Sequence, residues 1–205
     1  MKANTRPGPT RRLLLALGAA LPFPALAQSA PAEVVERFHA ALIELMRNAR
    51  SLGTRGRFER LRPAMEAAFD LPAMTRIAVG PPWSRMGREG QAALVQAFSD
   101  WSVATYANRF NAYSGESFTT SGETTLQNGD RLVRTSLNRV SDAPVQLNYL
   151  LRRGADGWRI VDVYLTGTIS ELASRRSEFA GVLQSGGAER LAAELRQRTA
   201  DLLGG

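Results

Sequence analysis

The chain of 205 residues contains no cysteine and only one histidine, His39. Without cysteine it can form no disulfide and no thioether link to a lipid, so its fold depends on its core alone. One histidine, with no carboxylate cluster at ligand spacing, does not make a metal site. A Ser-His-Asp triad would have to use His39, which we interpret instead as a partly buried histidine with a local partner. We therefore predict no metal and no cofactor.

Long hydrophobic runs are also missing. The run from Leu13 to Leu21 is too short to cross a membrane, which takes about 20 apolar residues. Basic residues precede it, and Ala25-Leu26-Ala27 follows as a small-x-small cleavage pattern. We therefore predict a signal peptide over residues 1–27, cleaved near Ala27, and a single domain over residues 28–205. Because two arginines precede the run, the sequence leaves two export routes open, the general secretory pathway and the twin-arginine pathway.

Lysine is almost absent, because Lys2 is the only one in the chain. The formal net charge is +7 at pH 7, but the predicted leader carries four basic residues and no acidic residue, so the mature charge is +3. A charge this small does not favour nucleic acid as a partner. The remaining basic residues are all arginine, which suits contacts with carboxylates or with anionic lipid headgroups. Arg152, Arg153, Arg175 and Arg176 are candidates for such a patch, or for an ordinary solvated face.

The hydrophobic periodicity changes twice along the chain. Spacing of three and four predicts helices first, then alternation predicts strands, and the helical spacing returns at the end. Asp70 is a candidate N-cap for a helix that Gly80-Pro81-Pro82 ends. The predicted helices are 32–52, 58–69, about 70–79, 90–113, 169–183 and 188–203, and the predicted strands are 117–124, 131–140, 144–153 and 158–165. This order predicts an α+β fold, in which helices cover a curved antiparallel sheet of about four strands and leave a conical apolar pocket.

The strand from Trp158 to Leu165 has apolar residues on both faces, which is typical of a strand covered on two sides. Asp162 is its one carboxylate, and Tyr164 shares its face. One interpretation is a general base in a small isomerase or dehydratase. We favour a structural salt bridge or hydrogen-bond network, because an unpaired buried carboxylate is costly and the chain offers many arginines.

Aromatic and aliphatic residues gather around the expected junction of the sheet and the helices. Taken singly, each fits an ordinary core, but together they fit a wide apolar pocket with few polar groups, such as an acyl chain or a polycyclic lipid needs. Such a function needs no catalytic residue, so we predict a binding protein and not an enzyme. The predicted lipid-binding residues are Met74, Ile77, Trp83, Phe98, Trp101, Tyr106, Phe110, Leu147, Tyr149, Val161, Val163, Leu165 and Ile169.

Three segments carry a family resemblance: FDLPAMTRIAVGPPW (69–83), FSDWSVATYANRFNAYSGESF (98–118) and NYLLRRGADGWRIVDVYLTGTISELASRRSEF (148–179). They resemble the MlaC family of periplasmic phospholipid-binding proteins, also described as toluene-tolerance auxiliary components. Within it, YSGESF, WRIVDVYL and GTISELASRRSEF are most similar to the hopanoid-biosynthesis-associated HpnM subgroup. The similarity covers about residues 31–203.

The resemblance implies a soluble periplasmic carrier that holds lipid tails between its sheet and its helices. Such carriers shuttle lipid between an outer-membrane component and an inner-membrane ABC transporter with its MCE-domain protein, and they touch membrane surfaces only transiently. The subgroup implies a hopanoid as ligand or as pathway context, and the residues leave open whether hopanoid or phospholipid is bound.

Overall fold

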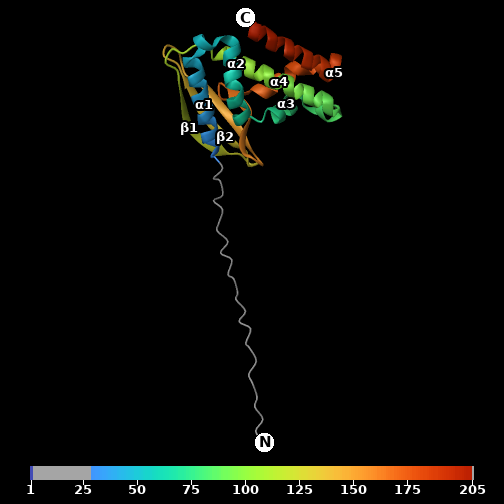
Figure 1. The fold of residues 1–205 in the computed structure, drawn as a ribbon, viewed down its shortest axis with the longest axis horizontal. Coiled ribbons are helices and arrows are strands. Elements are labelled where there is room, and N and C mark those ends of the chain that lie inside the picture. The colour runs from blue at the N-terminus through green and yellow to red at the C-terminus, as the bar shows by residue number, and fades with distance from the viewer. Residues whose placement is uncertain (2–28, 205) are drawn as a thin grey trace.

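Five antiparallel strands and two groups of helices make up the fold (Figure 1). The computed structural model describes residue 1 and residues 29–204, so the predicted signal peptide lies outside the described residues except for Met1. The helices are α1 (Pro31–Arg47), α2 (Ala49–Ala68), α3 (Leu71–Val79), the 3-10 helix η1 (Pro81–Arg85), α4 (Arg88–Arg109) and α5 (Glu171–Gly204). The strands are β1 (Ser117–Thr125), β2 (Arg131–Asn138), β3 (Val145–Gly154), β4 (Gly157–Leu165) and β5 (Ile169–Ser170).

The sheet follows the chain order β1-β2-β3-β4-β5, with every neighbouring pair antiparallel. This confirms the α+β class and the four predicted strands, whose ends differ by two residues at most. The fifth strand corrects the prediction of a helix from residue 169. Ile169 and Ser170 pair with Leu165 and Tyr164, so α5 begins only at Glu171. The tight turn before β5 places Gly167 at φ 81°, a conformation that favours glycine.

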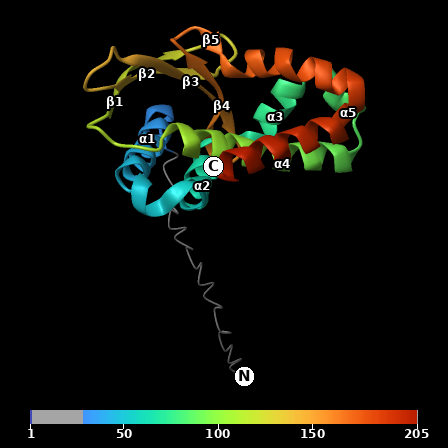
Figure 2. The same cartoon turned by 90° about the horizontal axis from the view of Figure 1, so that it is seen from above.

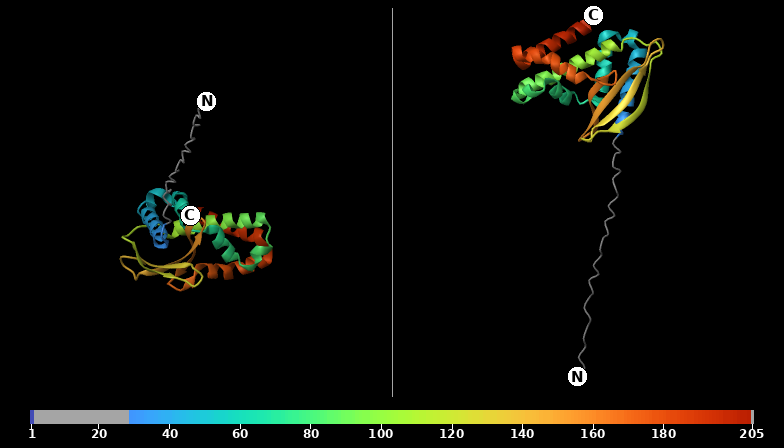
Figure 3. Two further views of the ribbon diagram at one scale, coloured as in Figure 1. Left: turned by 90° about the horizontal axis from the view of Figure 1, so that it is seen from below. Right: turned by 180° about the vertical axis from the view of Figure 1, so that it is seen from behind.

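The sheet is curved, and α1 lies in its concave face (Figure 3, left). The apolar side of α1, which includes the fully buried Phe38, packs against residues of the sheet such as Tyr149. His39 is buried on the same helix, 3.0 Å from the Tyr149 hydroxyl through Nε2 and stacked on Phe118 at 3.8 Å between ring centroids. This confirms the interpretation of His39 as a histidine with a local partner.

Strand β4 is buried on both faces, as its sequence predicts. The four residues from Ile160 to Val163 are all buried. A bulge at Val161 interrupts the alternation, because Leu151 pairs with Ile160 while Leu150 pairs with Asp162. The outer edge of β4 is also covered, since the Asp70 amide donates to the Ile160 carbonyl at 2.9 Å.

The remaining helices form a second layer beside the sheet, where α4 contacts α2, α3 and α5 (Figure 2). Gly187, at φ 64°, reverses the direction of α5, so its two halves lie antiparallel. The predicted break between two C-terminal helices is therefore confirmed. The predicted helix 32–52 is corrected, because α1 ends at Arg47 and α2 follows at once, with an interruption at Gly53. The predicted helix 90–113 also ends earlier, at Arg109.

The N-terminus of α3 is capped as predicted, because the Asp70 carboxylate accepts a hydrogen bond from the Ala73 amide at 2.9 Å. Among the described residues, every helix is either too short or too polar to span a membrane.

We expect His39 to make the stability of the protein depend on pH. Burial lowers the pKa of His39 from 6.5 to about 3. Between these values the unfolded chain binds a proton that the native state excludes. The free energy of unfolding therefore falls as the pH drops below 6.5, and at pH 5 the loss is about 2 kcal/mol relative to neutral pH.

The test is urea unfolding of the wild type and of His39→Gln at pH 7 and pH 5. Glutamine still reaches the Tyr149 hydroxyl but does not titrate, so the stability gap between the two proteins should narrow by about 2 kcal/mol at pH 5. An equal gap at both pH values would show that His39 is not held neutral.

Candidate binding pocket

A largely apolar pocket lies where the start of α5 meets α4, with α2, α3 and β4 forming its other walls. Its volume is about 40 Å³, which holds no more than about three waters. The lining residues are Met65, Phe69, Met74, Phe98, Trp101, Ser102, Thr105, Tyr106, Arg109, Val163, Glu171, Leu172 and Arg175. Ligand pockets usually measure about 300–1,000 Å³. This pocket is therefore much smaller than the wide conical space that the sequence predicted.

The structure brings five of the predicted lipid-binding residues together in this pocket. These are Met74, Phe98, Trp101, Tyr106 and Val163. They come from α3 and α4, which are neighbours in the sequence, and from the distant strand β4. Phe98 and Trp101 lie edge to face, with ring centroids 6.0 Å apart, and form the α4 wall.

The other predicted residues lie outside the pocket. Leu147 and Tyr149 are buried in β3, and Val161 is buried at the bulge of β4. Phe110 stacks on Tyr106 at 5.8 Å, beside the lining but not in it. The remaining four are half-buried or exposed at other places on the core surface: Ile77, Trp83, Leu165 and Ile169.

Sequence reasoning placed none of the serine, threonine or charged residues of the lining in the pocket. Ser102, Thr105 and Arg109 follow Phe98 and Trp101 at intervals of one to four residues and lie on the same side of α4. Spacing alone could have placed them, but every residue predicted for the pocket was aromatic or aliphatic, and Arg175 was considered only for a surface patch. Glu171 and Arg175 are likewise one helical turn apart at the start of α5.

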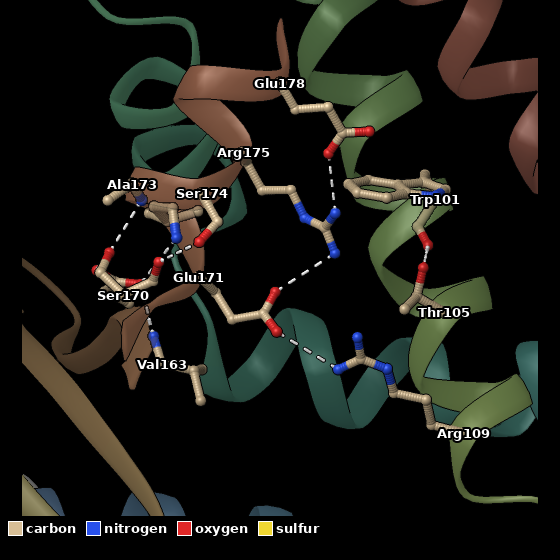
Figure 4. A network of polar contacts seen from close by, with 12 residues as sticks. Trp101, Thr105, Arg109, Val163, Ser170, Glu171, Ala173, Ser174, Arg175 and Glu178 are labelled. Atoms are coloured by element: carbon tan, nitrogen blue, oxygen red, sulfur yellow. Dashed lines mark hydrogen bonds and ion pairs between the residues drawn. The ribbon is translucent and has the colours of Figure 1, made fainter. Parts of the chain in front are cut away.

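The charged side chains of the lining, Arg109, Glu171 and Arg175, form one network of ion pairs at the start of α5 (Figure 4). The Glu171 carboxylate lies between two guanidinium groups, 3.5 Å from Arg109 Nη1 and 3.4 Å from Arg175 Nη2. Arg175 also reaches Glu178, at 3.0 Å, and its guanidinium carbon lies 4.5 Å from the ring centroid of Trp101. The pocket is therefore apolar inside and charged only at one end.

Tyr106 connects the apolar wall with the charged mouth. Burial raises the pKa of its hydroxyl far above the usual value, and the nearby Glu171 carboxylate raises it further. Tyr106 thus stays protonated as a hydrogen-bond donor. Tyr106 is itself partly exposed, and its hydroxyl is not among the buried side-chain atoms that lack a hydrogen-bond partner in the described part of the chain.

Asp162 holds the start of α5 beside the pocket. Its Oδ1 accepts hydrogen bonds from the amides of Val163, at 2.8 Å, and Leu172, at 3.2 Å, and its Oδ2 accepts from the Ser170 hydroxyl at 2.5 Å. Ser170 in turn caps the helix by accepting from the Ala173 amide at 2.9 Å. This confirms the structural interpretation of Asp162, with backbone and serine donors in place of arginine.

The arginines considered for a surface patch have separate partners. Arg152 forms a bidentate pair with the buried Asp130, at 3.1 and 2.7 Å, and Arg176 donates to the Ile77 carbonyl at 2.9 and 2.6 Å. Only Arg175 lines the pocket. In the part of the chain that the structure describes, no group of three or more His, Asp or Glu side chains is placed to hold a metal ion.

The comparisons with known proteins agree with this architecture. A family model described as MlaC protein matches residues 36–197. Among solved structures, the chain is similar to the phospholipid-binding protein from Ralstonia solanacearum, which was solved in complex with a phospholipid. The identity is 21%, the TM-score is 0.75, and the match covers 85% of this chain and 99% of the other. The search of curated proteins finds no match.

We expect Asp162→Asn to destabilise the fold by about 2 kcal/mol, because hydrogen bonds to a charged acceptor are worth about 1.5–3 kcal/mol and the amide turns one acceptor into a donor. Urea unfolding measures the change. Asp142→Asn is the matched control, because Asp142 is 64% exposed and its one ion pair among the described residues is with Arg139. A loss no larger than in this control would contradict the role of Asp162.

Proposed function

We propose a lipid-carrier function for this chain, which belongs to the MlaC family. The observation that carries the proposal is the pocket itself, which has an apolar interior and charged side chains only at its mouth. This arrangement matches an amphipathic ligand, whose hydrocarbon part enters while its polar headgroup stays at the rim. A phospholipid and a hopanoid both have this character.

The closed volume of about 40 Å³ means that a lipid must part the walls of the pocket. The interior suits such a change, because Met65 and Met74 are flexible side chains that repack around guests of different shape. Each methylene group that leaves water contributes about 0.8 kcal/mol, so one acyl chain can offset a substantial rearrangement.

We infer that the carrier works in the periplasm, after export by the predicted signal peptide. There it takes phospholipid or hopanoid between the two membranes, with an inner-membrane ABC transporter, its MCE-domain protein and an outer-membrane component as partners. Contact with a membrane surface is transient. The alternative of an isomerase or dehydratase that uses Asp162 as its base is disfavoured, because both oxygens of this carboxylate already accept hydrogen bonds.

The test is mass spectrometry, under denaturing conditions, of lipids that remain with the purified protein. We expect a phospholipid or hopanoid in the wild type, and less of it in Val163→Phe, whose ring enters the pocket. A ring that excludes two methylene groups costs about 1.6 kcal/mol, so lipid affinity should fall about tenfold.

Leu147→Phe is the matched control, because Leu147 is also a buried strand residue but does not line the pocket. Both variants overpack the sheet, and only the first should lose lipid. Thr105→Phe is a second variant that obstructs the pocket, in case Val163→Phe does not fold. Thr105 is half-buried and lines the pocket from α4, opposite Val163. Absence of lipid from the wild type, or equal retention in all the variants, would contradict the proposed function.

A further inference from the structure

The sheet has one open edge, which is the outer side of β1 (Figure 2). At the opposite side, β4 is covered by β5 and by the hydrogen bond from the Asp70 amide to the Ile160 carbonyl. Within residues 29–204, no strand pairs with the outer side of β1. Edge strands are usually short, or carry lysine, proline or a bulge that prevents pairing with another chain.

Strand β1 has such protection only in its second half. There the register shifts between Thr120 and Gly122, and Glu123 forms an ion pair with Arg131 at 3.1 Å. The first half, residues 117–120, pairs regularly with β2 and contains no charged residue and no proline. Its outer side can therefore accept a further strand.

A groove of about 610 Å³ lies along the same edge, between α1 and the first half of β1. Its lining residues are Glu36, His39, Ala40, Ile43, Glu44, Arg47, Phe118 and Thr120. Ile43 is half-buried and is not among the apolar side chains that pack against the core. The groove thus presents apolar surface directly beside the open edge.

The α1 wall of this groove carries opposite charges at its two ends. Glu36 lies toward the N-terminus and Arg47 at the C-terminus, with Ala40 and Ile43 between them, and these four residues form the α1 stripe. Glu36 has no hydrogen bond or ion pair with any described residue. Arg47 contacts only the exposed Tyr113, 3.5 Å from its hydroxyl and 5.1 Å from its ring centroid. Both charges are therefore available to a partner.

The α1 stripe is complementary to itself, because its residues follow at intervals of four, three and four positions. When two copies of α1 lie antiparallel about a two-fold axis between residues 41 and 42, Glu36 of each copy lies opposite Arg47 of the other. The apolar residues of the stripe then meet at the centre. The other acid of the groove, Glu44, already pairs with Arg60 at 2.8 Å.

We propose that this face is a docking surface for a second copy of the chain. The two β1 strands pair antiparallel through residues 117–120, and the two α1 helices lie antiparallel beside them. One two-fold axis perpendicular to the sheet serves both contacts, because His39 stacks on Phe118 and so places the middle of the α1 stripe beside the regular half of β1. Such an interface closes on itself and yields a dimer.

The pairing joins two five-stranded sheets into one and covers the open edge of both. The docking surface shares no residue with the lining of the apolar pocket. The proposal therefore goes beyond the lipid-carrier function and does not depend on it.

The first test is sedimentation equilibrium of the purified protein over a wide range of concentrations. We expect the wild type to change from monomer to dimer as the concentration rises. Glu36→Arg places like charges together at both symmetric contacts, so the dissociation constant of the dimer should rise about tenfold. Arg47→Glu should act in the same way, and the variant with both changes should return to the wild-type value, because its charges are exchanged.

Glu189→Arg is the matched control. Glu189 is an exposed glutamate of α5, in the second layer of helices, and has no hydrogen bond or ion pair with any described residue. The control makes the same change in net charge as Glu36→Arg, and it should leave the dissociation constant unchanged.

Amide hydrogen exchange tests whether β1 takes part. The outward-facing amides of residues 117–120 should exchange more slowly in a concentrated sample of the wild type than in a dilute one. Glu36→Arg should remove this difference.

A wild type that stays monomeric at every concentration would overturn the proposal and leave the β1 edge to a different protein. A dimer that Glu36→Arg weakens no more than Glu189→Arg does, or that leaves residues 117–120 unprotected, would place the interface on another face of the molecule.

Discussion

The carboxylate of Asp162 is the point on which the rest of the site depends. It is buried in β4, and its hydrogen bonds to Ser170 and Leu172 fix where α5 leaves the sheet. Glu171, Leu172 and Arg175 line the pocket from the first turns of α5, so their positions follow from this anchor. A salt bridge in its place would have brought a long, flexible side chain into a tightly packed strand. Two backbone amides and the Ser170 hydroxyl hold the helix without such a side chain.

The closed pocket is consistent with a protein that carries an apolar ligand through water. An open apolar cavity of several hundred Å³ would expose its lining whenever no lipid was bound. The packing of α4 against α5 buries Phe98 and Trp101, and the ion pairs of Glu171 lie at one end of the pocket lining. In the proposed carrier, a bound lipid would exchange one set of apolar contacts for another.

Much of the fold could be predicted from the sequence, because the signals were local. The alternating residues of the four long strands, the cap at Asp70 and the break at Gly187 all act within a few residues of their own position. The strand β5 could not be predicted in this way. It has only two residues, and its pairing with Leu165 depends on a turn whose conformation tertiary contacts decide.

The site was predictable only in part. Phe98, Trp101 and Val163 stood out because they are large or central to a strong pattern, and they do line the pocket. Arg109 and Glu171 could not be identified from the sequence. They line the pocket only because α5 packs against α4, and no local pattern encodes that contact. The volume of the pocket could not be predicted from the sequence either, because it depends on how closely side chains from five elements pack.

The central claim is that a hydrocarbon chain occupies the space beside Trp101. The chain has three tryptophans, so replacing Trp83 and Trp158 with phenylalanine leaves Trp101 as the single indole fluorophore. Phospholipid with brominated acyl chains quenches an indole that it touches. Our account predicts strong quenching of Trp101 relative to the same lipid without bromine, whereas unchanged Trp101 fluorescence with lipid demonstrably bound would contradict it.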